Sequence, residues 1–312
     1  MKLSVVTTMY YSRNYLQEFY KRTLSVIREL GISYEFIFVD DGSPDDSLLV
    51  ALQLQSSDQK IKVVELSRNF GHQRAIMTGL LHASGDYVFL IDCDLEESPE
   101  LLKEFWSKMV NQEKIDVVYG VQQKRKGEWV ERISGRLFYK LLSALSPVEY
   151  PADTTTARVM TRKYVDSIVR FSEKELDLWG IFALAGFNQQ PVSVVKGSKG
   201  STTFTFRKKV KRAIEIITSF SHRPLYLTFL LGVVCFFVAF VNVFFILYKK
   251  LILNVEVEGW ASILASIWFV GGMILLVLGI FGIYLSKMFL EIKNRPLTIV
   301  RNVYTRSDTF SS

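Results

Sequence analysis

The chain has 312 residues, of which 49% are hydrophobic and 22% are charged, and its formal net charge is +7. This composition excludes a disordered chain, and the length suits one medium domain with additions or two units. Basic residues gather around two long apolar runs and not among base-stacking aromatics, so we expect an anionic membrane surface as a partner and no nucleic acid. The two cysteines, Cys93 and Cys235, predict no disulfide, which agrees with a reducing compartment.

Short apolar runs alternate with segments of helical periodicity over the N-terminal part of the chain. Strands are expected at 3–8, 35–39, 61–66, 87–91 and 117–120. Helices are expected at 14–30, from Ser43 and Pro44 onward, at 73–83 and at 101–110. Strands that alternate with helices predict an α/β domain with a mostly parallel, doubly wound sheet, in which ligands bind beyond the carboxyl ends of the strands.

Acidic residues follow two of the expected strands. Asp40 and Asp41 end the second strand, and Asp92 and Asp94 end the fourth. Carboxylates at positions i and i+2 of an extended chain point to the same side, and they repel unless a cation lies between them. Hard oxygen ligands suit Mg²⁺ or Mn²⁺, and Mg²⁺ leaves its other positions to water and phosphates. The pattern predicts a metal–diphosphate site, and an acidic loop after a strand is the alternative interpretation.

Two further segments combine apolar and basic faces at helical spacing. Residues 128–145 carry Arg132 and Arg136 on the polar face. This segment is either an ordinary surface helix or an interfacial helix that presents arginine to an anionic lipid headgroup. Residues 207–223 repeat the pattern directly before an apolar run and are expected to form a basic amphipathic interfacial helix.

Residues 225–248 and 260–286 contain no charged side chain, and each run exceeds the roughly 20 residues that span a bilayer. Lysine and arginine cluster before the first run and after the second, so the positive-inside rule places both ends in the cytoplasm, although Lys249 and Lys250 in the connector oppose it. We expect a multi-pass protein of the cell inner (cytoplasmic) membrane. Its expected parts are a cytoplasmic domain at 1–206, the interfacial helix at 207–223, two transmembrane helices within 224–286 and a cytoplasmic tail at 287–312.

Four short segments, taken together in their order along the chain, match the pattern of a known family. They are Phe-Val-Asp-Asp-Gly-Ser at 38–43, Ser-Arg-Asn-Phe-Gly at 67–71 leading to Gly79 and Gly85, Asp-Cys-Asp-Leu at 92–95 with Pro99, and Ser-Phe-Ser at 219–221 with Pro224. With two C-terminal spans, they resemble the family-2 glycosyltransferases of the polyprenyl-phosphate type, which include dolichol-phosphate-mannose synthases and bacterial undecaprenyl-phosphate sugar transferases. The resemblance implies a Rossmann-like GT-A fold, a nucleotide-sugar donor, expected to be a UDP-sugar, Mg²⁺ or Mn²⁺ as cofactor, and a polyprenyl phosphate acceptor.

The resemblance also assigns roles to particular residues. The implied catalytic residues are Asp92, Asp94 and Arg132, and the implied metal ligands are Asp92, Asp94 and Glu96. The implied nucleotide-sugar contacts are Thr7, Asp40, Asp41, Asp92, Lys196, Lys199 and Arg207. The implied contacts to the acceptor phosphate are Arg125, Arg132, Ser134 and Arg136.

Several residues keep two interpretations. Asp153 binds sugar hydroxyls or caps a turn, and Trp179 shapes the sugar pocket or packs in the core. His72 is expected as a residue at a helix start, not as a base, and Cys93 as a small filler at a strand end. The segments at 7–11 and 152–158 depart from the family pattern near the expected pockets, so the family does not supply the identity of the sugar.

The predicted function is an inverting, metal-dependent transfer of a sugar from a nucleotide-sugar to polyprenyl (undecaprenyl) phosphate at the cytoplasmic membrane face, for cell-envelope glycan or lipid modification. An alternative acceptor is a hydroxyl of a glycan or of a lipid-linked oligosaccharide. That reaction needs a general base, for which Asp153 or Glu97 is the candidate. A non-catalytic membrane scaffold is the third interpretation, and homo-oligomerisation stays open.

Overall fold

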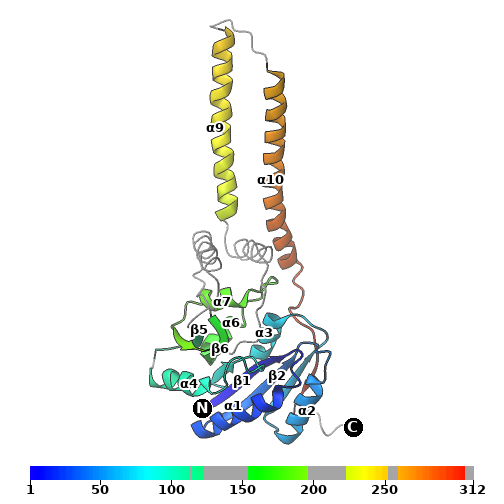
Figure 1. Ribbon diagram of the computed structural model, residues 1–312, viewed down its shortest axis with the longest axis vertical. Coiled ribbons are helices and arrows are strands. Elements are labelled where there is room, and N and C mark those ends of the chain that lie inside the picture. Colours follow the sequence, from blue (N-terminus) through cyan, green and yellow to red (C-terminus); the bar gives the residue numbers. More distant parts are fainter. Residues whose placement is uncertain (113, 123–153, 196–222, 252–258, 306–312) are drawn as a thin grey trace. The chain divides into compact units, whose positions relative to one another are not determined.

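The computed structural model describes residues 1–112, 114–122, 154–195, 223–251 and 259–305 (Figure 1). These residues belong to two compact units. One unit contains the N-terminal strands and helices together with the residues from Arg295 onward, and the other contains two long helices. Each unit is described by itself.

One sheet organises the first unit, and its described strands run in the order β7-β5-β6-β4-β1-β2-β3-β8. The strands are β1 (Lys2–Met9), β2 (Ser33–Asp40), β3 (Ile61–Leu66), β4 (Tyr87–Leu90), β5 (Val117–Gln122), β6 (Thr154–Thr161), β7 (Gln189–Val194) and β8 (Val300–Tyr304). Strands β4, β1, β2 and β3 are parallel, as are β5 and β7. Strand β6 is antiparallel to β4 and β5, and β8 is antiparallel to β3. The expected mostly parallel sheet is confirmed.

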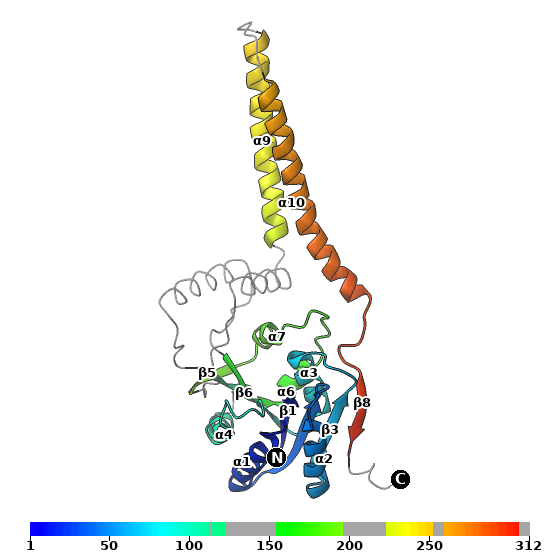
Figure 2. The ribbon, with the colours of Figure 1, turned by 45° about the vertical axis from the view of Figure 1, so that its right-hand side comes forward.

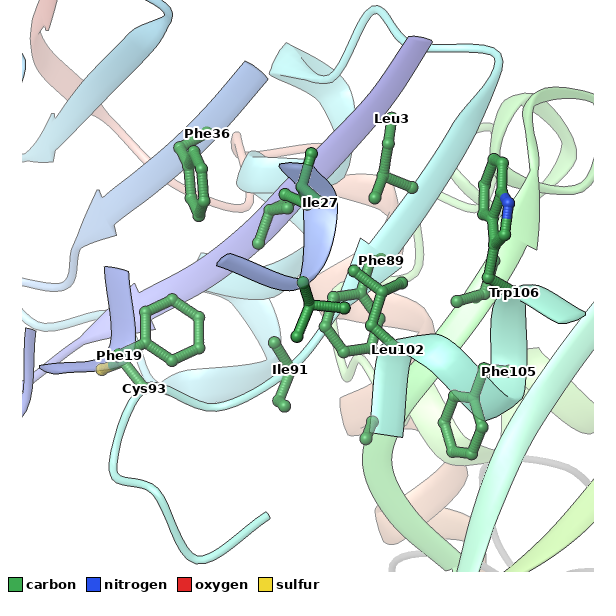
Figure 3. Close-up of a cluster of buried hydrophobic side chains, with 14 of the residues drawn as sticks. Leu3, Phe19, Ile27, Phe36, Phe89, Ile91, Cys93, Leu102, Phe105 and Trp106 are labelled. Carbon is green, nitrogen blue, oxygen red and sulfur yellow. The ribbon is translucent and has the colours of Figure 1, made fainter. Parts of the chain in front are cut away.

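The central strands are buried on both faces, because alternate residues feed two separate cores. The helices of this unit are α1 (Leu16–Leu30), α2 (Ser47–Ser57), α3 (His72–His82), α4 (Leu101–Asn111), α6 (Arg162–Ile168) and α7 (Leu178–Leu184). Phe36 faces the core that α1, α2 and α4 cover, and it belongs to the same hydrophobic cluster as Phe19 and Ile27 (Figure 3). Its neighbour Ile37 faces the opposite core, which α3, α6 and α7 cover. The near-continuous apolar runs in the sequence follow from this double burial.

The helix expected from Ser43 onward begins only at Ser47. The Asp45 carboxylate accepts hydrogen bonds from Ser43 Oγ at 2.6 Å and from the Ser47 backbone N–H at 3.1 Å. These local bonds hold the segment as a turn, which is the usual way that serine and aspartate compete with a helix. Ser43 is thereby kept in the loop that follows β2.

Strands β6, β7 and β8 were not among the expected elements. Strand β8 lies within the stretch expected as a cytoplasmic tail, and it forms the edge of the sheet beside β3 (Figure 2). The chain that follows the second apolar helix therefore returns to the first unit.

The second unit contains α9 (Arg223–Leu251) and α10 (Trp260–Ile292), which lie side by side (Figures 1 and 2). Their most apolar stretches, Arg223–Asn242 and Ser266–Ile292, have mean hydropathies of 2.4 and 2.3, and neither is buried. At 29 and 33 residues, both helices exceed the length that crosses a bilayer. They are candidate membrane spans at the positions that the sequence predicts.

Candidate active site

The acidic residues singled out in the sequence lie at one edge of the sheet, where β1, β2 and β4 reach their carboxyl ends. Asp40 is the last residue of β2, and Asp41 follows it directly. Asp92 and Asp94 lie in the loop that follows β4. Because these strands are parallel neighbours, their loops meet at the same edge. The order of the strands in space therefore assembles carboxylates that are about fifty residues apart in the chain.

Asp40 is a buried acid with only 3% of its surface exposed. Its carboxylate accepts one hydrogen bond, from the Ser43 backbone N–H at 3.3 Å. Burial, together with the nearby carboxylates of Glu65, Asp41 and Asp45, raises the pKa of Asp40 to about 6 against the effect of that hydrogen bond. Asp40 therefore changes charge close to neutral pH.

Asp41 holds the loop after β3 in place. Its two carboxylate oxygens accept hydrogen bonds from the backbone N–H groups of Phe70 at 2.7 Å and Gly71 at 3.0 Å. Gly42 has φ +63°, and a Cβ at this position would approach the Arg68 carbonyl carbon to 2.5 Å. The loops after β2 and β3 therefore interlock, and Asp41 builds this edge of the sheet.

Asp92 is held by side chains from other elements. Its Oδ2 accepts a hydrogen bond from Thr156 Oγ1 on β6 at 2.7 Å. Its Oδ1 lies 3.4 Å from Nε2 of His72, the first residue of α3, and His72 Nδ1 lies 3.0 Å from Thr8 Oγ1 at the end of β1. The position expected for His72 is confirmed, but its contact with Asp92 was not foreseen. Neither was Thr156, because only the pairing of β6 with β4 brings it to Asp92.

A tight turn shapes the chain that follows Asp92. Asp94 Oδ1 accepts a hydrogen bond from the Glu96 backbone N–H at 3.0 Å, and Leu95 between them has φ +63°. Glu97, only 1% exposed, accepts bonds from the backbone N–H groups of Thr156 at 3.1 Å and Ala157 at 2.6 Å. Glu97 thus anchors β6, and both of its carboxylate oxygens accept backbone hydrogen bonds.

The acidic edge fits a cation that is shared with a ligand. Among the described residues, no group of three His, Cys, Asp or Glu side chains is placed to hold a metal ion, so the three expected ligands, Asp92, Asp94 and Glu96, do not form such a group. Asp92 and Asp94 nevertheless supply two carboxylates at the end of one strand. Mg²⁺ uses one or two carboxylates and completes its shell with water and phosphate oxygens, so this donor set fits an ion held between the protein and a diphosphate. It does not fit a metal site closed by protein ligands alone.

A buried arginine, Arg158, lies on β6 two residues after Thr156. Arg158 on β6 is 2% exposed, and it donates hydrogen bonds to the carbonyl oxygens of Thr156 at 3.2 Å and Thr155 at 3.0 Å. Its guanidinium carbon lies 4.8 Å from the ring centroid of Trp179 and 3.9 Å from that of Phe182, and burial lowers the pKa of Arg158 to about 10. Trp179 packs on this guanidinium, which favours the packing interpretation for this tryptophan.

Two exposed tyrosines follow β1 and were not predicted as site residues. Tyr10 and Tyr11 are 47% and 61% exposed, with ring centroids 4.8 Å apart. Tyr11 has φ +54°, and its backbone N–H donates to Ser43 Oγ at 2.8 Å. A non-glycine residue in this conformation costs of order 1–3 kcal/mol, and such residues cluster at functional sites. Exposed aromatic rings at this edge offer a stacking surface.

The remaining predicted residues divide into two groups. Thr7, expected to contact the nucleotide-sugar, is buried on β1, so that contact stays a prediction. Cys93 is a buried filler, as expected; it belongs to the same hydrophobic cluster as Phe19 (Figure 3), and burial raises the pKa of its thiol to about 11. The residues that lie outside the described part of the chain are Arg125, Arg132, Ser134, Arg136, Asp153, Lys196, Lys199 and Arg207. The contacts expected from these residues stay predictions.

Known proteins are similar to this chain in sequence over most of its length. A profile of Glycosyl transferase family 2 matches residues 4–169. A Mycobacterium tuberculosis protein named as a putative glycosyltransferase is 43% identical over 304 residues, covering 97% of this chain and 89% of that protein. The bactoprenol glucosyl transferase of Shigella phage SfII is 31% identical over 305 residues, covering 96% of this chain and 98% of the relative.

Solved structures resemble part of the chain at lower sequence identity. Glucosyl-3-phosphoglycerate synthase from Mycobacterium tuberculosis is 21% identical, covers 70% of this chain and 79% of its own, and has a TM-score of 0.48. The family profile spans more than half of the chain, and it includes the acidic edge of the sheet. The chain therefore belongs to glycosyl transferase family 2, and its mostly parallel sheet is the GT-A-like fold expected from the sequence.

Proposed function

We propose that this glycosyltransferase moves a sugar from a UDP-sugar to undecaprenyl phosphate or a related polyprenyl phosphate, with inversion at the anomeric carbon. One observation carries the proposal. The bactoprenol glucosyl transferase matches 96% of this chain and 98% of its own length, so the match includes the apolar helices as well as the sheet. Two candidate spans suit an enzyme whose acceptor is a membrane lipid.

The donor is proposed to bind across the carboxyl edge of the sheet. Asp40 would accept hydrogen bonds from the nucleoside, and the exposed rings of Tyr10 and Tyr11 would stack on its base. Asp92 and Asp94 would hold Mg²⁺ or Mn²⁺ against the diphosphate, and the bound ion would offset the charge that develops on the leaving nucleoside diphosphate. Lys196, Lys199 and Arg207 are the proposed contacts of that diphosphate from the protein.

The chemistry follows from the charge of the acceptor. A lipid monophosphate is anionic near neutral pH, so its oxygen can attack the anomeric carbon without a general base. The bond from that oxygen to the carbon forms as the bond from the carbon to the diphosphate oxygen breaks. The protein would then act mainly by positioning and charge neutralisation, with Arg132 and Arg136 holding the acceptor phosphate. A hydroxyl acceptor would need a general base, for which Asp153 is the candidate to test, since Glu97 is buried and bonded to the backbone of β6.

The proposed place of the reaction is the cytoplasmic face of the inner membrane, with the sheet unit in the cytoplasm. The basic residues that flank the two apolar helices support this orientation. A sugar on a polyprenyl phosphate is an activated lipid-linked donor, so the product would serve cell-envelope glycan or lipid modification.

A transfer assay tests the proposal. The purified full-length protein is incubated with undecaprenyl phosphate, Mg²⁺ or Mn²⁺ and a panel of UDP- and GDP-sugars, and lipid products are identified by mass spectrometry. We expect one lipid-phosphate-sugar product, which disappears with chelator and in Asp94→Ala. Binding of a nucleotide-sugar without any lipid product would instead favour a hydroxyl acceptor, and full activity in Asp94→Ala would remove the proposed metal role.

A further inference from the structure

Strand β8 is an integral part of the sheet although it follows both apolar helices in the chain. It pairs with β3 in the register Val63↔Tyr304, Val64↔Val303 and Glu65↔Asn302, with a shift between Glu65 and Leu66. Side chains on both of its faces enter the cores, since Tyr304 packs against one cluster and Val303 against the other. Thr298, just before the strand, bonds to Thr78 on α3 at 2.8 Å. This segment is therefore anchored to the sheet and to α3.

The side chains of β8 converge on one buried carboxylate. Glu65 on β3 is 7% exposed, and its oxygens accept hydrogen bonds from Arg301 Nη1 at 2.9 Å, Asn302 Nδ2 at 2.9 Å and Tyr304 OH at 2.8 Å. Burial alone would raise the pKa of Glu65, but these three partners outweigh it and lower the pKa. All three partners come from β8. Glu65 is the register partner of Asp40, so β8 compensates a negative charge beside the candidate nucleoside site.

Arg301 also reaches the loop that follows β3. Its Nη2 donates a hydrogen bond to the Ser67 carbonyl oxygen at 2.9 Å, while the Ser67 backbone N–H donates to the Ile299 carbonyl oxygen at 2.9 Å. The far end of the same loop is held by Asp41 through Phe70 and Gly71. The loop at 67–71 is thus clamped at one end by the acidic edge and at the other end by β8.

We propose that β8 positions the loop at 67–71, which Asp41 holds at the carboxyl edge of the sheet where the donor is proposed to bind, and that Arg301 is the positioning residue. Arg301 suits this role because one guanidinium can hold the Glu65 carboxylate and the Ser67 carbonyl together. Without it, this end of the loop keeps only the backbone bond from Ser67 to Ile299, and Glu65 loses its cation next to Asp40. The proposal rests on the proposed function only in taking this loop as part of the donor site.

The experiment compares Arg301→Ala with a matched control in the full-length protein. Lys103→Ala breaks the ion pair between Lys103 on α4 and Glu29 on α1, and so removes a basic partner elsewhere on the sheet unit. Hydrogen exchange of the peptide that contains residues 67–71 is measured without ligand, and donor KM and kcat are measured in the transfer assay. We expect faster exchange in Arg301→Ala alone, with the donor KM raised roughly three- to tenfold, the size of a loop-ordering cost on binding, and kcat nearly unchanged.

Arg301→Lys keeps the charge but lacks the fork that holds the Glu65 carboxylate and the Ser67 carbonyl oxygen together, so we expect a donor KM between those of the wild type and Arg301→Ala. This milder variant keeps the test possible if Arg301→Ala fails to fold. A purely structural edge strand would give lower thermal stability in both Arg301 variants, with unchanged loop exchange and unchanged KM, and that result would overturn the proposal. If the wild-type protein binds no nucleotide-sugar, the proposed function fails and the donor role of the loop fails with it. The exchange result then still decides whether β8 clamps the loop.

Discussion

At the scale of single residues, we expect Asp40 to make the proposed donor binding depend on pH. The pKa of Asp40 is raised to about 6 by burial and by neighbouring carboxylates, so a rise in pH through 6 ionises it. Hydrogen bonds donated by the nucleoside stabilise the ionised form of Asp40, so the ionised form binds the donor more tightly than the protonated form. We therefore expect donor affinity to increase from pH 5 to pH 7, by up to about tenfold because about a tenth of Asp40 is ionised one unit below its pKa.

Calorimetry with the donor found in the transfer assay measures this affinity. The diphosphate of a nucleotide-sugar is esterified at both ends and stays ionised between pH 5 and pH 7, so a change in affinity over this range comes from the protein. Asp40→Asn should bind more weakly than wild type at pH 7 and show a flatter profile. An equally steep profile in that variant would assign the pH dependence to another group.

His72 contacts Asp92, so we expect its replacement to weaken metal binding. It lies between Thr8 and Asp92, where it restrains the carboxylate proposed to hold the metal. Loss of a partner that orients a metal ligand typically costs about 10–100-fold in metal affinity or activity, and we expect a loss of this size in His72→Ala. The readout is a Mn²⁺ titration of transfer activity. His82→Ala is the control, since His82 lies at the other end of α3 and contacts the Thr78 carbonyl.

At the scale of elements, the interlock between the loops after β2 and β3 is a testable unit. Gly42 has φ +63° and its missing Cβ leaves room for the Arg68 backbone. We expect Gly42→Ala to lower the free energy of unfolding by about 2–4 kcal/mol, from strained backbone and steric overlap together, and to weaken donor binding. Gly31→Ala separates the two causes, because Gly31 has φ +66° with open space around it. Similar losses of thermal stability in both variants would rule out the overlap.

The elements also show how far sequence patterns reach. Strands β1 to β5 were predicted because each is an apolar run buried on both faces, and Asp40 and Asp92 were found because they end such runs. Strand β6 begins Thr-Thr-Thr-Ala-Arg, and its burial comes from antiparallel partners that local periodicity does not reveal. Strand β8 follows a 33-residue apolar helix, so nothing near it in the chain indicates β3 as its partner. Thr156 and His72 were missed as partners of Asp92 for the same reason, since their contacts exist only in space.

At the scale of the whole molecule, the sheet constrains how the apolar helices can cross a membrane. Strands β7 and β8 belong to one sheet, while α9 and α10 lie between them in the chain. The chain must therefore end on the same side of the membrane as it began. Two crossings meet this requirement, and a single crossing does not. This constraint is independent of the distribution of basic residues. It predicts that β8 and the N-terminal strands share one side of the membrane, with the connector at 252–258 on the other.

Labelling of single cysteines in intact cells with a membrane-impermeant maleimide tests this arrangement. Cys235 is replaced by serine, and the buried Cys93 serves as an unreactive background. We expect Glu256→Cys in the connector to react from outside, whereas Ser57→Cys on α2 and Ile299→Cys beside β8 react only after lysis. Labelling of Ser57→Cys and Ile299→Cys from opposite sides would contradict an even number of crossings. Labelling of both from outside would keep the paired crossings but reverse the proposed orientation, because the sheet unit would then lie on the side away from the cytoplasmic pool of nucleotide-sugars.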